Sequence, residues 1–250
     1  MESISSCRKW RLLCITGTEK LVGISGLVFD IDGTLYHHPE YHAAGTREEI
    51  SEIGRILGYS YNDMESIIAT RKQYIALQLN RQATMTETVL SLGITREQWN
   101  DLRCRAWQPE QWLTIDKEIC RMMMQLKNRY KIAFGTNSPL AIGKQVLRMI
   151  GITAIMPNAH IFGSESFGIS KPNPDFFSLI ALRLELMTSQ CLSIGDREEA
   201  DGTPAIAAGY RDALIVSGNR DALLMATSKL LNDCNMERRY GQRITPIVSV

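Results

Sequence analysis

Two acidic residues, Asp30 and Asp32, stand one residue apart at the end of an apolar run, in the segment SGLVFDIDGTLYHHPEY at 25–41. Carboxylates this close repel each other, and each loses solvation when it is partly buried. A positive group beside them would offset both costs. The pair therefore predicts a site that also contains a cation.

Thr136 and Asn137 stand at the end of a further apolar segment, and Asp196 ends another, with Asp201 shortly after it. Lys171 stands just before Pro172, in the loop that precedes a predicted helix. The two later aspartates bring the number of carboxylates to four, with no Cys or His in the set. Oxygen ligands of this kind suit Mg²⁺ together with waters and a substrate phosphate. The expected cation is therefore Mg²⁺, and Lys171 adds a second positive charge.

A site of this composition favours attack of a carboxylate on phosphorus. Mg²⁺ and a lysine reduce the repulsion between the carboxylate and a dianionic phosphate, and they stabilise the charge of the transition state. A phospho-aspartate would divide the reaction into two easier steps. A second acid two residues away can protonate the leaving alkoxide and then deprotonate the water that frees the enzyme, so the pair Asp30 and Asp32 could supply both roles.

The elements that must position these residues are strands of a parallel sheet. Short apolar runs at 26–32, 131–137, 191–196 and 212–218 are continuous rather than alternating, which is typical of strands buried on both faces. In such sheets ligands bind beyond the carboxyl ends of the strands, where the polar residues stand. The fold class that follows is α/β, a doubly wound parallel-sheet (Rossmann-like) core.

Helices are predicted between the strands. The segment 138–151 offers Ser138 as an N-cap and Gly151 as a stop, and Asn173 would cap a second helix ahead of Pro174. This alternation of strand and capped helix supports the α/β assignment.

One long segment, 37–114, breaks the alternation. Thr46 with Glu49 and Thr95 with Gln98 have the spacing of capping boxes, and 62–80 is long and amphipathic. The segment is therefore predicted to be an all-helical insert. The expected division begins with an N-terminal arm at 1–24, which is either flexible or an over-long start before the domain. A core at 25–36 and 115–235, the helical insert at 37–114 and a C-terminal tail at 236–250 follow, and the tail is either an edge strand or disordered.

Four motifs in order resemble those of the haloacid dehalogenase (HAD) superfamily. The family has D-x-D-G-T, a Thr or Ser at a strand end, a Lys often before Pro, and G-D-x-x-x-x-D. They are matched here by DIDGT at 30–34, Thr136, Lys171 and GDREEAD at 195–201. The resemblance covers about residues 25–220, and each motif alone is weak whereas the ordered set is specific. The helical insert lies where this family places its first type of cap.

The resemblance implies a role for each matching position. Asp30 would be the nucleophile and a metal ligand, and Asp32 would be the general acid and base with its backbone carbonyl on the metal. Lys171 would be a catalytic residue that bridges the nucleophile and the phosphate. Gly33, Thr136 and Asn137 would bind the phosphate, Asn137 through its backbone amide. Asp196 would bind the metal directly, and Asp201 would bind it or orient its waters.

These observations predict a Mg²⁺-dependent phosphohydrolase that acts on a small soluble phosphomonoester through a phospho-aspartate. Asp32 argues against dehalogenation, which has no leaving alkoxide to protonate. A sugar-phosphate mutase and a non-catalytic binding module stay open as alternatives. Nucleotides, sugar phosphates and phosphoglycolate-type acids all stay open as substrates.

Composition limits the partners. The chain has 28 Lys plus Arg against 27 Asp plus Glu, so no global charge favours nucleic acid or a membrane surface. Six cysteines without a C-x-x-C pair favour a reducing, cytoplasmic setting, and no apolar run approaches the roughly 20 residues that span a bilayer. The expected partner is a small phosphorylated metabolite, and the oligomeric state is open.

Other residues in the insert have simpler interpretations. We interpret His37 and His38 as hinge residues in preference to substrate contacts. The basic side chains of Arg71, Lys72 and Arg81 are interpreted as a solvated face. The tryptophans of the insert are expected to pack its core or its boundary with the core domain: Trp99, Trp107 and Trp112.

Overall fold

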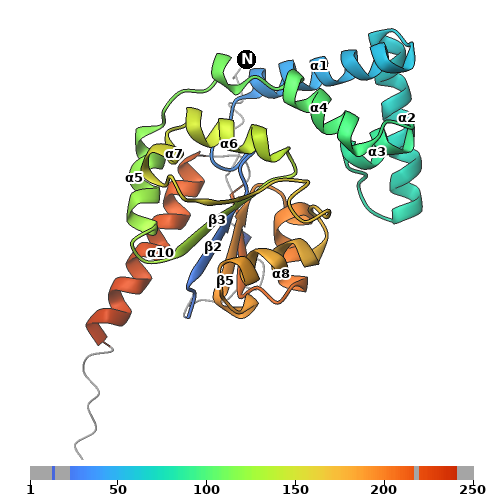
Figure 1. Cartoon of the computed structure of the whole chain (residues 1–250). Helices are drawn as coiled ribbons and strands as arrows, with labels where there is room; N and C mark the ends of the chain where they lie inside the picture. Colours follow the sequence, from blue (N-terminus) through green and yellow to red (C-terminus); the bar gives the residue numbers. More distant parts are fainter. Residues whose placement is uncertain (1–12, 15–22, 217–219, 241–250) are drawn as a thin grey trace, which may run out of the picture. The chain divides into compact units, whose positions relative to one another are not determined.

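The computed structural model describes residues 13–14, 23–216 and 220–240, which contain one mixed sheet and two sets of helices (Figure 1). The strand order in the sheet is β1-β6-β5-β2-β3-β4. β2 to β6 are all parallel, and β1 joins β6 antiparallel. The strands are β1 (Leu13–Cys14), β2 (Gly26–Phe29), β3 (Lys131–Gly135), β4 (His160–Phe162), β5 (Cys191–Gly195) and β6 (Asp212–Ile215).

The central strands are mostly apolar because helices cover both faces of the sheet. Every residue of β2, β5 and β6 is buried, as are four of the five in β3. Phe29 at the end of β2 pairs with Phe134 in β3 and with Ile194 in β5, so these strands end at the same edge. The α/β, doubly wound prediction is confirmed, and this shared edge is what positions the site.

The two helical layers of the core are distinct. On one face, α8 packs Phe176, Phe177 and Ile180 against Val28 and Ala133 of the sheet. On the other face α5 and α10 lie side by side, as both figures show. The remaining core helices are short or lie near the strand ends. Core helices are α5 (Lys117–Leu126), α6 (Leu140–Met149), α7 (Ile152–Ile155), α8 (Pro174–Arg183), η2 (Thr188–Gln190), η3 (Glu198–Gly202, a π-helical turn), α9 (Thr203–Ala207) and α10 (Arg220–Tyr240).

The predicted helix starts of the core are half right. Asn173 caps α8 as expected, since its Oδ1 accepts a hydrogen bond of 2.9 Å from the amide of Asp175. Ser138 does not cap α6, which begins at Leu140 after Pro139. The hydroxyl of Ser138 donates a hydrogen bond to Asp32 instead. Gly151 follows the end of α6 with φ +91°, a conformation that glycine adopts at little cost.

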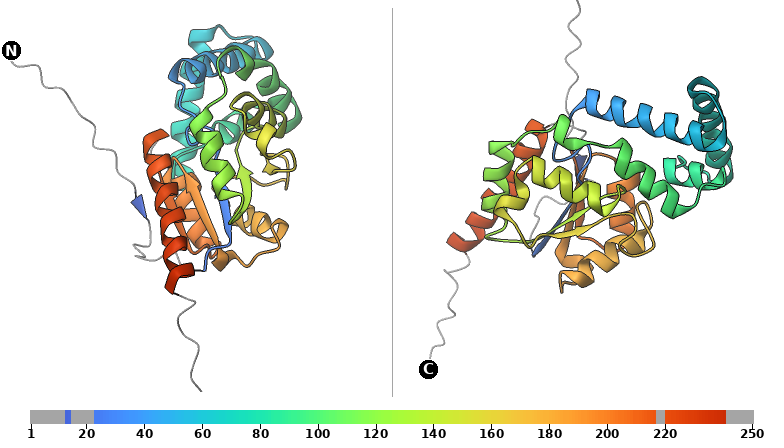
Figure 2. Two further views of the ribbon diagram at one scale, coloured as in Figure 1. Left: turned by 90° about the vertical axis from the view of Figure 1, so that its left-hand side faces the viewer. Right: turned by 45° about the horizontal axis from the view of Figure 1, so that its top comes forward.

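The insert between β2 and β3 is helical, as predicted, and residues 38–113 form a compact unit of their own. Its core contains Ile53, Met64, Val89, Trp99 and Leu102. Figure 2 shows the unit from two further directions. Its helices are α1 (Pro39–Leu57), α2 (Tyr61–Leu79), α3 (Met85–Ser91), α4 (Arg96–Ala106) and η1 (Pro109–Gln111).

Two capping boxes are present in the helical unit, and one predicted box is wrong. Thr95 and Gln98 form the expected box at α4, and a box at Thr84 and Glu87 begins α3. Thr46 and Glu49 lie inside α1, so their spacing marks no helix start.

Glu49 is instead the centre of a buried polar network in the helical unit. It accepts hydrogen bonds from Arg103 Nε at 3.0 Å and from Trp107 Nε1 at 2.5 Å. The Trp107 ring lies against α1 where Gly45 leaves room, because a Cβ there would come within 2.7 Å of the ring. Burial raises the pKa of Glu49, and the charge of Arg103 opposes that shift.

Several polar residues of the helical unit have structural partners. His38 caps α1, because its Nδ1 accepts a hydrogen bond of 3.2 Å from the amide of Tyr41. Arg71 donates to the hydroxyl and carbonyl of Ser91, each at 2.9 Å. Arg81, which lies beyond the end of α2, pairs with Glu87.

The ends of the chain differ from the expected division. Leu13 and Cys14, within the predicted N-terminal arm, form an edge strand on β6. α10 continues to Tyr240, which is five residues into the segment predicted to be a tail. Residues 1–12, 15–22 and 241–250 lie outside the described part of the chain. Among the described residues, no helix is long and apolar enough to cross a membrane.

Candidate active site

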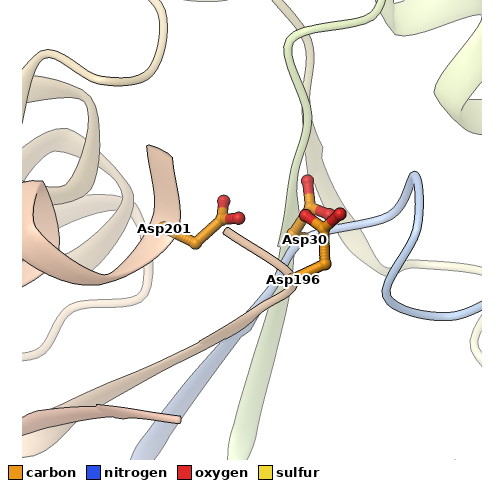
Figure 3. Close-up of side chains that lie close together, drawn as sticks. All are labelled: Asp30, Asp196 and Asp201. Atoms are coloured by element: carbon orange, nitrogen blue, oxygen red, sulfur yellow. The ribbon is translucent and has the colours of Figure 1, made fainter. Parts of the chain in front are cut away.

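Three carboxylates converge at the carboxyl ends of β2 and β5 (Figure 3). Asp30 directly follows β2, Asp196 directly follows β5, and Asp201 lies in the π-helical turn η3. One oxygen from each lies within 4.8 Å of the others. Asp30 and Asp201 are buried, and Asp196 is partly buried. The fold thus concentrates negative charge where the sequence analysis expected it.

Lys171 supplies the positive charge inside this group. Its side chain is 2% exposed, and its Nζ lies 2.5 Å from Asp30 Oδ1 and 2.5 Å from Asp201 Oδ1. The Asn137 side chain holds the Lys171 backbone on both sides, donating to its carbonyl at 2.9 Å and accepting from its amide at 3.0 Å. The lysine is therefore fixed at both its backbone and its ammonium group.

The acids outnumber the lysine, and their pKa values show the consequence. Burial raises the pKa of Asp30 to about 8, and the neighbouring Asp201 and Asp196 add to that shift while Lys171 opposes it. Burial and Asp201 raise the pKa of Asp196 to about 6. Burial alone would lower the pKa of Lys171, but Asp201 and Asp30 outweigh it and raise that pKa. Lys171 alone therefore does not balance the three acids.

These donors fit Mg²⁺. All three ligands are carboxylate oxygens, which this ion prefers. Asp196 Oδ1 is buried and has no hydrogen-bond partner among the described residues; the nearest cation is Arg197 Nε, on a largely exposed side chain, at 3.5 Å. A buried carboxylate oxygen left in that state is costly unless a cation satisfies it.

Two glycines allow the acids to approach. Gly33 has φ +84°, and a Cβ there would lie 2.5 Å from Asp196 Oδ2. At Gly195 a Cβ would lie 2.2 Å from the Cβ of Asp201. Any larger residue at either position would displace a carboxylate of the group. Gly195 was not singled out from the sequence, although it precedes Asp196 in the fourth motif.

Asp32 stands apart from this group and is bound by hydroxyl groups. Its Oδ2 accepts hydrogen bonds from Thr136 Oγ1 at 2.7 Å and from Ser138 Oγ at 2.9 Å. Its Oδ1 accepts one from Tyr36 Oη at 2.7 Å. Thr136 was predicted to bind phosphate, and in this structure its hydroxyl donates a hydrogen bond to Asp32. The side chain of Asn137 contacts Lys171, whereas the group predicted to lie near the phosphate is the Asn137 backbone amide.

The structure therefore brings all eight of the predicted residues to one edge, in two sets. The first comprises Asp30, Lys171, Asp196 and Asp201, with Gly33 and Asn137 supporting it. The second is Asp32 with Thr136, and it includes two residues that sequence reasoning missed, Tyr36 and Ser138. Neither residue has a distinctive sequence signal for this role. Ser138, which precedes Pro139, has the pattern of a helix cap instead.

The family model of the haloacid dehalogenase-like hydrolases matches residues 24–209. The chain belongs to this family of hydrolases.

Its relatives include phosphatases. A phosphoglycolate phosphatase from Cereibacter sphaeroides is 30% identical over 79% of this chain and 87% of its own. A ribulose-1,5-bisphosphate 5-phosphatase from Halopiger xanaduensis is 26% identical over 76% of this chain and 84% of its own. The crystal structure of an HAD phosphatase from Thermococcus onnurineus matches with a TM-score of 0.51 at 17% identity, covering 76% of this chain and 85% of that one. This last likeness supports the fold alone.

Proposed function

We propose that this protein is a Mg²⁺-dependent phosphatase that releases phosphate from a small phosphomonoester through a phosphorylated Asp30. The observation that carries the proposal is the position of Lys171, whose Nζ lies 2.5 Å from a carboxylate oxygen of both Asp30 and Asp201. A buried ammonium at this point reduces the repulsion between an acidic nucleophile and an anionic phosphate. A purely structural ion pair would not need the third acid beside it.

Asp30 is the proposed nucleophile. Its Oδ2 accepts a hydrogen bond of 2.8 Å from the hydroxyl of Thr34, and its Oδ1 faces Lys171. These two contacts fix the carboxylate's orientation before a substrate arrives, which lowers the entropic cost of attack. Asp30, Asp196 and Asp201 would hold Mg²⁺, with Asp32 contributing through its backbone carbonyl. When bound, the ion supplies charge that offsets the negative charge on the phosphoryl oxygens.

Asp32 is the proposed general acid and base. In the first step an Asp30 oxygen bonds to phosphorus, the bond to the leaving oxygen breaks, and that oxygen takes a proton from the carboxyl group of Asp32. In the second step the Asp32 carboxylate takes a proton from water as the water oxygen bonds to phosphorus and Asp30 is released. The net reaction consumes one water and yields an alcohol and phosphate.

The substrate is proposed to be a small phosphorylated metabolite. The named relatives act on phosphoglycolate and on a sugar bisphosphate, so phosphorylated small acids and sugar phosphates stand first. Gly33, Thr136 and Asn137 are proposed to contact the phosphate. For Thr136 this requires its hydroxyl to turn away from Asp32, because that hydroxyl donates to Oδ2 of Asp32 in the present arrangement.

The test is phosphate release from a panel of phosphorylated acids, sugar phosphates, nucleotides and an aryl phosphate, with Mg²⁺ and with chelator. Asp30→Asn should abolish release, whereas Asp175→Asn, the same change at an exposed position outside the site, should not. No release from any compound by folded, Mg²⁺-loaded wild type would refute the proposal. Recovery of a rearranged phosphate ester in place of free phosphate would identify a mutase.

A further inference from the structure

The hydroxyl groups around Asp32 form a compact set, which we name the hydroxyl clasp: Tyr36, Thr136 and Ser138. All three are buried, with at most 9% of each residue exposed. They reach Asp32 from two directions, because two of them follow β3 and the third lies four residues along the chain from Asp32 itself. The backbones of Asp32 and Tyr36 also form an isolated β-bridge, which closes the loop between them.

The clasp differs in chemistry from the contacts of Asp30. Asp30 faces the ammonium group of Lys171, a fixed positive charge that favours an ionised nucleophile. The clasp offers neutral hydroxyl groups, and each of these can donate or accept a hydrogen bond after a simple rotation. A carboxyl group that passes a proton to one partner and takes it from another needs neighbours that can change direction in this way.

We propose that Tyr36 and Ser138 are positioning residues for proton transfer by Asp32. Tyr36 holds Oδ1 at 2.7 Å and Ser138 holds Oδ2 at 2.9 Å, so the two together fix the rotation of the carboxyl group about its Cβ–Cγ bond. Fixing this rotation keeps the carboxyl group facing the leaving oxygen. The inference rests on the proposed function, in which Asp32 is the general acid and base.

The leaving group of the substrate separates positioning from mere structural support. An alkoxide is a poor leaving group and needs the proton of Asp32, whereas a nitrophenolate departs without one. The parameter kcat/KM reports the steps up to departure of the leaving group. Loss of positioning should therefore lower kcat/KM for an alkyl phosphate and leave the value for p-nitrophenyl phosphate nearly unchanged.

The experiment measures kcat/KM of Tyr36→Phe and Ser138→Ala on the best alkyl phosphate of the panel and on p-nitrophenyl phosphate. We expect a loss of about tenfold to a hundredfold on the alkyl phosphate and of less than about threefold on the aryl phosphate. Tyr210→Phe is the matched control, because it removes another buried phenol hydrogen bond, of 2.8 Å to the carbonyl of Phe177, away from the site. It should not change the ratio of the two values.

Each result has a definite meaning. Equal losses on both substrates, or none on either, would overturn the inference while leaving the proposed function intact. An inactive wild type would instead refute the proposed function. Melting temperatures show whether each variant folds. If Tyr36→Phe does not fold, the inference is tested by Ser138→Ala alone, through the difference between its losses of kcat/KM on the two substrates. The phenylalanine keeps the ring, so we expect it to fold.

Discussion

Each of the two compact units contains a buried carboxylate beside a cation. In the helical unit Glu49 is 4% exposed and lies 3.0 Å from Arg103 Nε. In the core Asp30 is 5% exposed and lies 2.5 Å from Lys171 Nζ. Burial raises the pKa of both acids. Burial and the presence of a paired cation therefore do not distinguish Glu49 from Asp30.

The difference lies in what surrounds each pair. Glu49 is satisfied by Arg103 and by the indole of Trp107, so its network is complete within the helical unit. Lys171 is shared by Asp30 and Asp201, and Asp196 lies beside them. Three acids around one buried ammonium are unbalanced, and a divalent cation would restore the balance. An excess of acid, rather than burial of an acid, is therefore what indicates a site.

The sharpest test of this difference is Asp30→Asn in the core. We expect phosphatase activity to fall by at least about a thousandfold, because the nucleophile is lost. In chelator, the melting temperature should stay the same or rise, since one lysine then faces fewer acids. Activity assays and thermal unfolding of the same preparation check both parts. A clear fall in melting temperature would mean that the core pair is structural, like Glu49.

The converse change is Glu49→Ala in the helical unit. It leaves the largely buried side chain of Arg103 without its carboxylate, so we expect a loss of about 3–5 kcal/mol in the free energy of unfolding of that unit. Three of the four tryptophans in the chain lie in this unit, so tryptophan fluorescence during urea unfolding reports on it.

The control for Glu49 removes both charges at once. Glu49→Met combined with Arg103→Met should cost far less than Glu49→Ala alone, since no charge is left unpaired. If the single and double variants lose equal stability, the network contributes through packing rather than through charge.

A smaller effect is expected from Mg²⁺ itself. Added Mg²⁺ should stabilise the core by about 2.7 kcal/mol at a concentration of 100 times its Kd, because the ion binds the folded form. Asp196→Asn should reduce that gain strongly, whereas Glu49→Gln should not alter it. The melting temperature over a Mg²⁺ titration measures both. An equal gain for wild type and Asp196→Asn would place the ion elsewhere.

The strands of the core could be predicted because they are buried on both faces. β2, β3, β5 and β6 appear in the sequence as continuous apolar runs, and the polar residues that follow β2, β3 and β5 fall at one edge by topology. β1 could not be predicted, since two residues carry no periodic signal and its pairing depends on β6, far away in the sequence. The end of α10 at Tyr240 was also missed, although Gly241 follows it in the sequence and glycine is a common residue just after the end of a helix.

Local patterns failed where tertiary contacts decide. Thr46 and Glu49 have the spacing of a capping box. Glu49 is nevertheless buried and accepts hydrogen bonds from Arg103 and Trp107, which lie 54 and 58 positions further along the chain. Ser138 has the pattern of an N-cap, but its hydroxyl donates a hydrogen bond to Asp32. In both cases the sequence shows which side chains can hydrogen-bond, and only the fold decides with which partner.

A third pair of a carboxylate with a cation, Asp116 with Arg220, is more exposed than the pairs of Glu49 and Asp30. Breaking it is expected to change stability the least. Asp116 accepts from Arg220 Nε at 2.6 Å and also caps α5 through the amides of Glu118 and Ile119. The hydrogen bond from Arg220 holds the pKa of Asp116 below its ordinary value. The folded state therefore gains stability from the ionised acid above the unfolded pKa of about 3.9, and loses it as the pH falls through the lower folded value.

Arg220→Gln should thus cost less than about 1 kcal/mol near pH 7, because solvent screens the pair. The cost should shrink as the pH falls below about 4, where Asp116 becomes protonated in both states. Urea unfolding of wild type and variant at several pH values measures it, and Arg183→Gln, an exposed arginine at the end of α8, is the control. A loss as large as that of Glu49→Ala would mean that exposure does not weaken such pairs here.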